Sequence, residues 1–239
     1  MGRPQSRWGQ GLAAVAVLAV VSCSAIDDPA APQTGDAKPS TSSSAGAPGN
    51  RADTGTLPGV PTAERARTEL AELKVAPHGS MSGYSRSKFP HWAEHGESCD
   101  TRETVLERDG TNVTQDDECR AVSGRWVSVY DGKTFNDASH LDIDHMVPLA
   151  NAWRSGANAW TQEKRKAFAN DLTHPQLLAV SAASNRSKGD QGPDEWQPPS
   201  KTYWCTYARA WVSVKSTYKL SVTENEKTTL TDMLGTCRS

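Results

Sequence analysis

Four residues of this 239-residue chain carry side chains that could act together in a hydrolytic reaction: Asp144, His145, Asn185 and Lys188. A carboxylate oxygen is a hard ligand suited to a divalent cation such as Mg²⁺, and an imidazole, whose ordinary pKa is near neutrality, can take a proton from water. An amide offers the cation a neutral oxygen, and an ammonium can hold a phosphate. These side-chain types therefore fit metal-assisted hydrolysis of a phosphate ester.

The segment that contains Asp144 and His145 is predicted to be a short strand. Apolar residues alternate imperfectly with polar ones over residues 143–149, and Pro148 would end the ladder because it has no N–H to donate. Neighbouring side chains of a strand leave on opposite faces, so the Asp and the His can serve one site only if the strand bends or twists. Asp142 projects from the same face as Asp144. It is either an extra ligand or, as we favour, a support for a ligand side chain.

The segment that contains Asn185 and Lys188 is predicted to be a strand followed by a short helix. Residues 177–180 form a compact apolar run, and the next residues are predicted to turn into a helix with Ser181 or Ser184 as its N-cap. Asn185 and Lys188 are three residues apart and therefore lie on the same helical face. A polar, helix-forming insert separates the two strands, so folding can bring the Asp-His pair back against the Asn and the Lys.

A strand with Asp-His, a second strand and a helix with Asn resemble the ββα-metal fold of HNH endonucleases. DHMVPL followed at a distance by NRSKGD is similar to the HNH module of the RNA-guided DNA nucleases. The chain is more similar still to the DUF1524-type HNH family of secreted actinobacterial proteins, over roughly residues 65–237. The motifs outside the core that carry this resemblance are YSRSKFPHW, CDTRETVLERDG, SGRWVSVYDG, DEWQPP and WCTYARAWVSVKSTYKL.

Carried over by position, the resemblance implies His145 as the general base and Lys188 near the substrate phosphate. It implies Asp144 and Asn185 as ligands of a divalent metal ion, Mg²⁺ in the first place and Mn²⁺ in the second. The chain departs from the family at Gln176, where members tend to carry an Asn that orients the catalytic His. We expect Gln176 to take over that role with a longer arm.

The first residues have the features of an export signal. Arg3 and Arg7 precede the apolar run GLAAVAVLAVV, which is too short to span a bilayer as a stable helix. The sequence therefore predicts a signal peptide over residues 1–22. The run VVSC, which ends at Cys23, resembles the bacterial lipobox, in which the Cys is lipidated. A lipid on Cys23 would be the protein's contact with the membrane, and the alternative is ordinary cleavage nearby, which would give a secreted protein.

The chain after Cys23 divides into a tether and one folded domain. Residues 23–60 are rich in Ser, Ala, Pro, Gly, Asp and Thr and contain almost nothing to bury, which predicts a disordered tether. Residues 61–239 form the predicted domain, which we expect to be a monomer. Within it, Thr62 is predicted to cap a helix, and residues 223–234 are predicted to form the last helix.

Four cysteines lie in the predicted domain. In an exported chain they imply a disulfide framework rather than zinc or redox chemistry. Three connectivities are possible, and we favour Cys99–Cys119 with Cys205–Cys237 because each closes a local loop. Each would stabilise the fold by roughly 3 to 4 kcal/mol in the chain-entropy model.

Two further segments bear on the site. RWVSVYDGKTF predicts a hairpin that turns at Asp-Gly and lies beside the Asp-His strand. His91 and His95 have the spacing of a metal pair, but Pro90 interrupts the segment and no third soft ligand is near, so we do not expect zinc there.

The insert AWRSGANAWTQEKRKAFAND combines aromatic and basic residues. Such a mixture can follow a nucleic-acid backbone, or it can be the exposed side of an amphipathic helix, and the sequence favours neither. The formal net charge of −2 gives no support for steering of the whole molecule toward polyanions. Attraction to nucleic acid would have to be local and metal-assisted.

The sequence thus predicts one α+β domain with a ββα-metal core that hydrolyses phosphodiester bonds of DNA, or of RNA, outside the cell. Two other classes of protein would share these residues. A surface lipoprotein that binds nucleic acid or a cell-wall polymer without cutting it is favoured by Gln176 in place of Asn. A hydrolase of another phosphate polymer, such as a teichoic acid, would use the same site chemistry.

Overall fold

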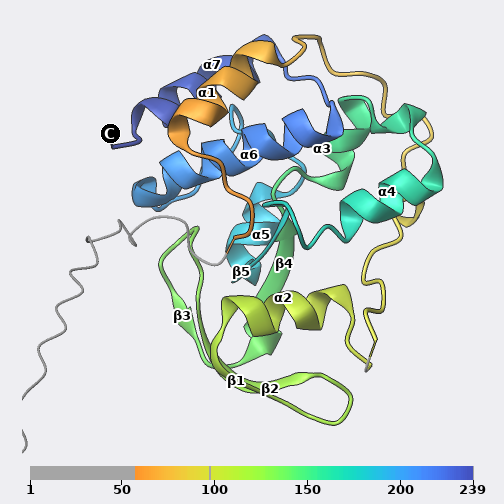
Figure 1. Ribbon diagram of the computed structural model, residues 1–239, viewed down its shortest axis with the longest axis vertical. Helices are drawn as coiled ribbons and strands as arrows, with labels where there is room; N and C mark the ends of the chain where they lie inside the picture. The colour runs from red at the N-terminus through yellow and green to blue at the C-terminus, as the bar shows by residue number, and fades with distance from the viewer. Residues whose placement is uncertain (1–56, 97, 239) are drawn as a thin grey trace, which may run out of the picture. The chain divides into compact units, whose positions relative to one another are not determined.

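The computed structural model (Figure 1) describes residues 57–96 and 98–238. The predicted signal peptide, Cys23 and nearly all of the predicted tether lie outside the described residues. Within the described ranges, no helix combines the length and the apolar character needed to cross a membrane.

The described part of the chain is a mixed α+β fold with two small sheets, ordered β1-β2-β3 and β4-β5. The strands are β1 (Thr111–Gln115), β2 (Ala121–Val127), β3 (Thr134–Phe135), β4 (Leu141–His145) and β5 (Leu177–Ser181). The α-helices are α1 (Ala63–Glu72), α2 (Thr101–Asp109), α3 (Leu149–Arg154), α4 (Gln162–Ala169), α5 (Ala182–Lys188), α6 (Trp204–Tyr218) and α7 (Glu224–Gly235). Single 3-10 turns lie at η1 (Arg86–Lys88), η2 (Ala138–His140), η3 (Ala157–Ala159) and η4 (Lys201–Tyr203).

The antiparallel pair β4-β5 is covered on both faces and lies between α2 and α6 (Figure 1). One face packs on α2 and β2 in a small cluster of buried residues: Val105, Leu106, Trp126, Leu141, Ile143, Leu177 and Ala179. The other face carries Leu178 and Val180 of β5 into the main core. Asp142 and Asp144 are the cross-strand partners of Val180 and Leu178, so both acidic residues share this second face.

The elements that border this pair begin and end close to the predicted positions. α5 follows β5 directly, and Ser181 is its N-cap, since Oγ of Ser181 accepts a hydrogen bond from the backbone N–H of Ser184 at 3.1 Å. β4 ends at His145, three residues before Pro148, the residue predicted to end the strand. α3 begins directly after that proline. The polar insert folds as α3, η3 and α4.

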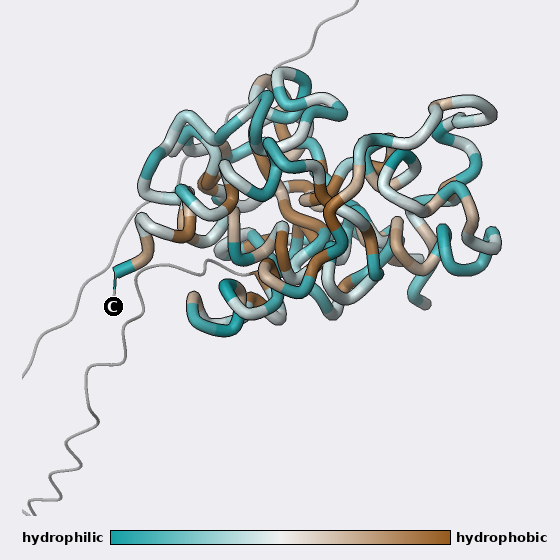
Figure 2. The backbone as a smooth tube through the Cα atoms, turned by 90° about the horizontal axis from the view of Figure 1, so that it is seen from above, coloured by the Kyte–Doolittle hydropathy of each residue, from teal (hydrophilic) through white to brown (hydrophobic). Residues whose placement is uncertain are grey.

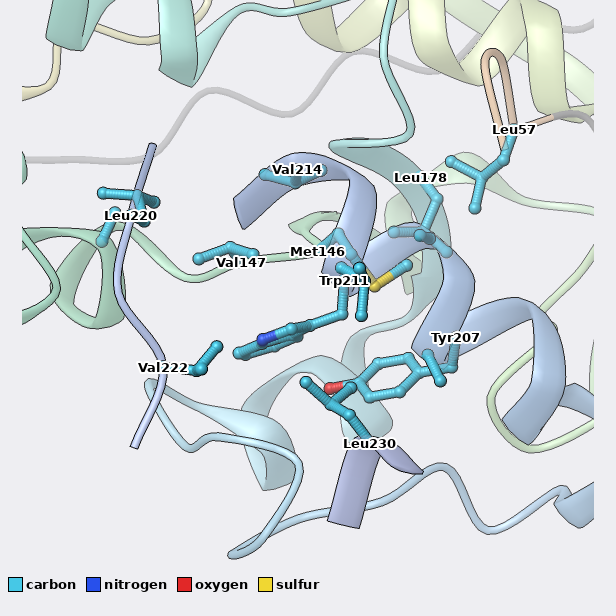
Figure 3. Close-up of a cluster of buried hydrophobic side chains, with 14 of the residues drawn as sticks. Leu57, Met146, Val147, Leu178, Tyr207, Trp211, Val214, Leu220, Val222 and Leu230 are labelled. Carbon is cyan, nitrogen blue, oxygen red and sulfur yellow. The ribbon is translucent and has the colours of Figure 1, made fainter. Parts of the chain in front are cut away.

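The main core gathers around α6. Figure 3 shows Trp211 and Tyr207 of α6 among aliphatic side chains from distant parts of the chain: Leu57, Met146, Val147, Leu178, Val214, Leu220, Val222 and Leu230. In Figure 2, hydrophobic segments run through the interior of the described part and hydrophilic ones through its outer loops. α1 and α7 lie beside α6 (Figure 1) and cover this core.

Capping and disulfides hold the outer helices in place. Thr62 caps α1 and Thr223 caps α7 with a capping box, at the starts predicted from the sequence. The disulfides are Cys99–Cys119 and Cys205–Cys237, the two pairs favoured above. The second of them fastens the end of the chain to the first turn of α6.

The predicted hairpin is present and packs against the Asp-His strand through side chains, but no strand of the hairpin pairs with β4 in the described part of the chain. β2 and β3 pair antiparallel, with a turn that places Gly132 at a φ of 73°. β3 is not paired with β4, because the turn η2 redirects the chain between them. The hairpin contacts the β4-β5-α5 unit through Trp126 of β2, which shares a buried cluster with residues of β4 and β5, and through two side chains of its turn, Tyr130 and Asp131.

Candidate active site

Two acidic side chains of β4 meet two side chains of α5. Nδ2 of Asn185 donates to Oδ2 of Asp142 at 3.1 Å. Nζ of Lys188 donates to Oδ1 and Oδ2 of Asp144 at 2.9 and 2.7 Å. Asp142 and Asp144 lie on one face of the strand because they are two residues apart, and Asn185 and Lys188 lie on one face of the helix because they are three residues apart. Each acidic residue of β4 therefore contacts one residue of α5. Because Asp142 takes the amide nitrogen of Asn185, the amide oxygen is the atom left for a ligand.

The carboxylate of Asp144 is buried, with 4% of the residue exposed, and lies between two donors. Besides Lys188, the hydroxyl of Tyr130 donates to Oδ2 of Asp144 at 2.6 Å. Burial, reinforced by the charge of Asp144, raises the pKa of Tyr130 well above its ordinary value. The phenol therefore keeps its proton and remains a donor to the carboxylate.

Lys188 is placed differently from the substrate contact that the sequence suggested. Its side chain is fully buried, and its third N–H donates to the backbone carbonyl of His145 at 2.8 Å. Burial lowers the pKa of Lys188, while the charge and hydrogen bonds of Asp144 raise it. All three ammonium hydrogens are used within the protein, so none is left for a phosphate. Lys188 therefore fixes the end of β4 rather than facing outward.

His145 lies at the end of β4 with 4% of its surface exposed. Its Nε2 is 3.0 Å from the carbonyl oxygen of Ala169, so the neutral ring carries its proton on Nε2 and its lone pair on Nδ1. Burial lowers the pKa of His145 to about 3, against the hydrogen bond to Ala169, which raises it. The ring of Trp92 lies 6.1 Å from the imidazole, centroid to centroid. The structure thus holds a neutral, oriented imidazole.

Gln176 is fully buried and holds the backbone just after His145. Its side chain accepts from the N–H of Val147 at 3.1 Å and donates to the carbonyl of the same residue at 3.0 Å. Its own carbonyl accepts from the N–H of Met146 at 2.6 Å. The amide therefore acts on the main chain that carries His145 and not on the imidazole itself.

Of these residues, Asp144, His145 and Asn185 line one cavity of about 260 Å³. Its lining comes from η1 and the residues before it, from β4 and α3, and from α5 with the turn that follows: Tyr84, Arg86, Ile143, Asp144, His145, Pro148, Leu149, Ala150, Asn185, Arg186, Gly189 and Asp190. Asp144, His145 and Asn185 are therefore brought to a single space, although the first two are neighbours in a strand. Both can serve one site because the strand ends at His145.

The cavity offers side-chain oxygen ligands of the kind that a hard divalent cation prefers, but only a few of them. Asp144 and Asn185 both belong to the lining. No group of three or more His, Cys, Asp or Glu side chains with the arrangement of a metal site occurs among the described residues. A cation held by one carboxylate and one amide would complete its shell with water and substrate oxygens, which is the way Mg²⁺ is commonly bound.

Three features of the site are not identified by the sequence analysis. Tyr130 was assigned to a hairpin, although it follows Trp126 and Ser128 on the buried face of that segment, a pattern that could have suggested an inward role. Asp131 accepts from the hydroxyls of Ser181 and Ser184 at 2.7 and 3.1 Å and thereby secures the start of α5. The carbonyl of Ala169, being backbone, left no signal in the sequence.

The alternative sites considered above find other uses in the structure. The rings of His91 and His95 hydrogen-bond to the carbonyl of Phe89 and the hydroxyl of Thr101. In the insert, Nζ of Lys164 lies 4.4 Å from the ring centroid of Trp160. The neighbouring basic residues also contact protein groups: Arg154 pairs with Asp190 and Arg165 donates to backbone carbonyls. These contacts favour the surface-helix interpretation of the insert.

Comparison with known proteins assigns the family. Residues 100–233 match the model described as GmrSD restriction endonucleases, C-terminal domain, and this span is more than half of the chain. The chain belongs to this family. The matched span includes all of β4, β5 and α5, so every residue of the candidate site from Asp142 to Lys188 lies within the GmrSD C-terminal-domain match. Membership indicates a nuclease-related function.

A fungal relative is also found. An uncharacterized secreted protein of Arthroderma benhamiae is 57% identical over 182 residues, which cover 76% of this chain and 89% of the relative. No solved structure matches the chain.

Proposed function

We propose that this domain is a metal-dependent endonuclease of the HNH type, which hydrolyses phosphodiester bonds of DNA, or of RNA, at a ββα-metal site formed by β4, β5 and α5. The observation that carries the proposal is the convergence of Asp144, His145 and Asn185 on one cavity. Membership in a restriction-endonuclease domain family supports the same chemistry.

His145 is the general base. Its Nδ1 lone pair accepts a proton from the water that attacks phosphorus, and the hydrogen bond from Nε2 to Ala169 keeps the ring oriented. The low pKa of His145, caused by burial, keeps the imidazole neutral at physiological pH. An incoming phosphate brings negative charge into the cavity and raises that pKa, which strengthens the base when substrate is bound.

Asp144 and Asn185 would hold the divalent cation. When bound, such a cation stabilises the negative charge that develops on the phosphate and the leaving oxygen. Lys188 and Tyr130 keep the carboxylate of Asp144 in one orientation, and Asp142 does the same for the amide of Asn185. This reassigns Lys188 from a phosphate contact to a residue that positions Asp144.

The test is cleavage of supercoiled plasmid by the purified, disulfide-intact protein with Mg²⁺, Mn²⁺ or EDTA. We expect metal-dependent nicking, and we expect His145→Ala to lower the rate by about 10²- to 10⁴-fold, the usual contribution of a general base. The matched control is His140→Ala, which removes an exposed histidine outside the cavity lining and should leave the rate unchanged. Circular dichroism would establish that both variants are folded.

Other results would overturn parts of this mechanism. Full activity of His145→Ala would remove His145 as the base, and an unchanged Mg²⁺ titration of Asp144→Ala would remove Asp144 as a ligand. A protein that retards DNA in a gel without shortening it, with or without EDTA, would be a binding module. Activity against a teichoic acid but not against DNA would point to the other class of phosphate polymer.

We also propose that the protein is exported. Two disulfides and a relative named as a secreted protein support this location, because disulfides persist in oxidising compartments. The signal peptide over residues 1–22 would direct export, and a lipid on Cys23 would hold the domain at the cell surface by the 23–60 tether. Cys23→Ser should move the protein from the membrane fraction to the medium of a bacterial host, and a soluble parent protein would contradict the anchor.

A further inference from the structure

Some charged side chains of the cavity lining are paired with an oppositely charged side chain of the protein, and others are not. Asp144 is paired with Lys188, and Asp190 is paired with Arg154 at 3.2 Å. The side chains of the two arginines of the lining, Arg86 and Arg186, make no hydrogen bond or ion pair to another residue in the described part of the chain, and both residues are exposed. The lining therefore presents two uncompensated guanidinium groups beside the neutral ring of His145.

The backbones that carry these two arginines are fixed, although the side chains are free. Arg86 lies in η1, between Tyr84, whose ring packs on Trp153 at 5.8 Å between centroids, and the fully buried Phe89. Arg186 directly follows Asn185 in α5, a helix secured by its N-cap and by the buried Lys188. Each guanidinium thus extends from a rigid base into the space at the cavity.

A guanidinium is the side chain best suited to such a position if the ligand is a phosphate. Its planar fork donates two parallel hydrogen bonds to one phosphate group, and it keeps its charge at every physiological pH. With Lys188 buried and fully used, these arginines are also the cations of the lining that remain able to reach a substrate.

We propose that Arg86 and Arg186 form a phosphate clamp that holds the backbone of a polynucleotide strand across the cavity, so that one phosphodiester lies beside His145. This inference rests on the proposed nuclease function and names the residues that bind its substrate. The clamp contacts phosphates and not base edges, so it binds without sequence preference. Local charge of this kind suits a protein whose net charge is −2.

The experiment measures binding separately from cleavage. A fluorescein-labelled single-stranded DNA oligonucleotide is titrated with the full exported chain carrying His145→Ala, and anisotropy is followed at several salt concentrations in EDTA and in Mg²⁺. Adding Arg86→Ala or Arg186→Ala should weaken binding by about fivefold, and each should lower the slope of log K against log salt by about 0.7, the value for one lost phosphate contact on a single strand. Arg86→Lys and Arg186→Lys should keep most of the slope and lose part of the affinity.

The control is Arg125→Ala, which removes an exposed arginine of β2 outside the cavity lining and should change neither affinity nor slope. Equal binding by the parent and both alanine variants would overturn the clamp, as would a parent that does not bind the oligonucleotide at all.

Plasmid nicking by the same arginine variants with His145 intact separates this inference from the proposed function. Normal nicking and binding by both variants would overturn the clamp and leave the nuclease standing. Absence of nicking with every metal, together with arginine-dependent binding, would overturn the nuclease and leave the clamp standing as the binding site of a non-catalytic protein.

Discussion

Two buried lysine–carboxylate pairs lie near one tryptophan, and only one of them includes a residue of the cavity lining. Lys188 pairs with Asp144 at 2.7 Å, and Lys215 pairs with Glu226 at 3.1 Å. Both lysines are fully buried, and their Nζ atoms lie 5.9 and 5.7 Å from the ring centroid of Trp211. The two pairs therefore have the same charges and similar burial, and both lie near the ring of Trp211.

Their remaining hydrogen bonds differ in purpose. Oε1 of Glu226 accepts from the ring N–H of Trp211, and Oε2 accepts from the backbone N–H of Thr223, so Glu226 ties the start of α7 to α6. Lys215 donates to Asn151, Ser155 and the carbonyl of Ser221. Neither residue lines the cavity, whereas Asp144 does. A buried ion pair is therefore a structural device in both places, and access to the cavity is what makes Asp144 a candidate for chemistry.

The largest expected effect is on stability, and it should be the same in both pairs. Lys188→Met and Lys215→Met each leave a buried carboxylate without its cation, which costs about 3 to 5 kcal/mol in the free energy of unfolding. Urea denaturation of the two variants measures this cost. At a temperature where both are folded, Lys215→Met should still cut plasmid and Lys188→Met should not. Equal cleavage by the two would remove the functional difference between the pairs.

The next effect separates the pairs by activity. Asp144→Asn removes the charge that faces the cavity and should lower plasmid cleavage by more than about 100-fold, the upper end of what loss of a metal-site support residue costs. Glu226→Gln keeps the shape of the α7 capping box and should lower stability while leaving the cleavage rate per folded molecule within about threefold of the parent, a change of less than 1 kcal/mol in the barrier. A comparable loss in both variants would mean that the cavity does not distinguish them.

Sequence reasoning could place the strands and the helix of the site because each has a local signal. The alternation around Ile143, the apolar run before Ser181 and the i, i+3 spacing of Asn185 and Lys188 all depend on near neighbours. The structure has β4, β5 and α5 at those places. The two disulfides close local loops and follow the same logic.

What the sequence could not show depends on contacts between distant segments. A lysine three residues after Asn185 has the same spacing whether it points into the core or outward, and only the packing of α5 on β4 decides that Lys188 is buried. The hydroxyl of Tyr130 donates to Asp144, but the hairpin pattern in the sequence does not show in which direction the Tyr130 side chain points. The hairpin packs on β4 through Trp126, but the sequence pattern does not show that β3 and β4 belong to separate sheets.

Two buried side-chain amides, those of Gln176 and Asn151, should differ in the same way. Gln176→Ala leaves the N–H and carbonyl of Val147 unpaired in the core, which should cost about 1 to 3 kcal/mol. Asn151→Ala should cost a similar amount, since its oxygen accepts from Lys215. Cleavage should fall only in Gln176→Ala, because that amide holds the chain after His145. Thermal unfolding and a nicking assay measure the two effects, and full activity of Gln176→Ala would show that His145 is positioned without it.

The smallest expected effect concerns a buried carboxylate without a lysine, Asp171. It accepts from the hydroxyls of Tyr218 and Thr173 and from the ring and backbone N–H of His174, in the loop between Ala169 and the start of β5. Burial raises the pKa of Asp171, but the hydrogen bonds, that of Tyr218 first, outweigh burial and leave the pKa below its ordinary value. The unfolded chain therefore takes up this proton at a higher pH than the folded chain does.

The stabilisation by Asp171 is accordingly present above its ordinary pKa and is lost as the pH falls through the lower pKa of the folded state. Asp171→Asn should cost about 1 kcal/mol at pH 7, the difference between hydrogen bonds to a charged and to a neutral acceptor. Urea unfolding of parent and variant from pH 7 to pH 3 should show the difference in free energy of unfolding shrinking as the solution becomes more acidic. A difference that stays constant would mean that the charge of Asp171 contributes nothing to the stability of the loop between Ala169 and β5.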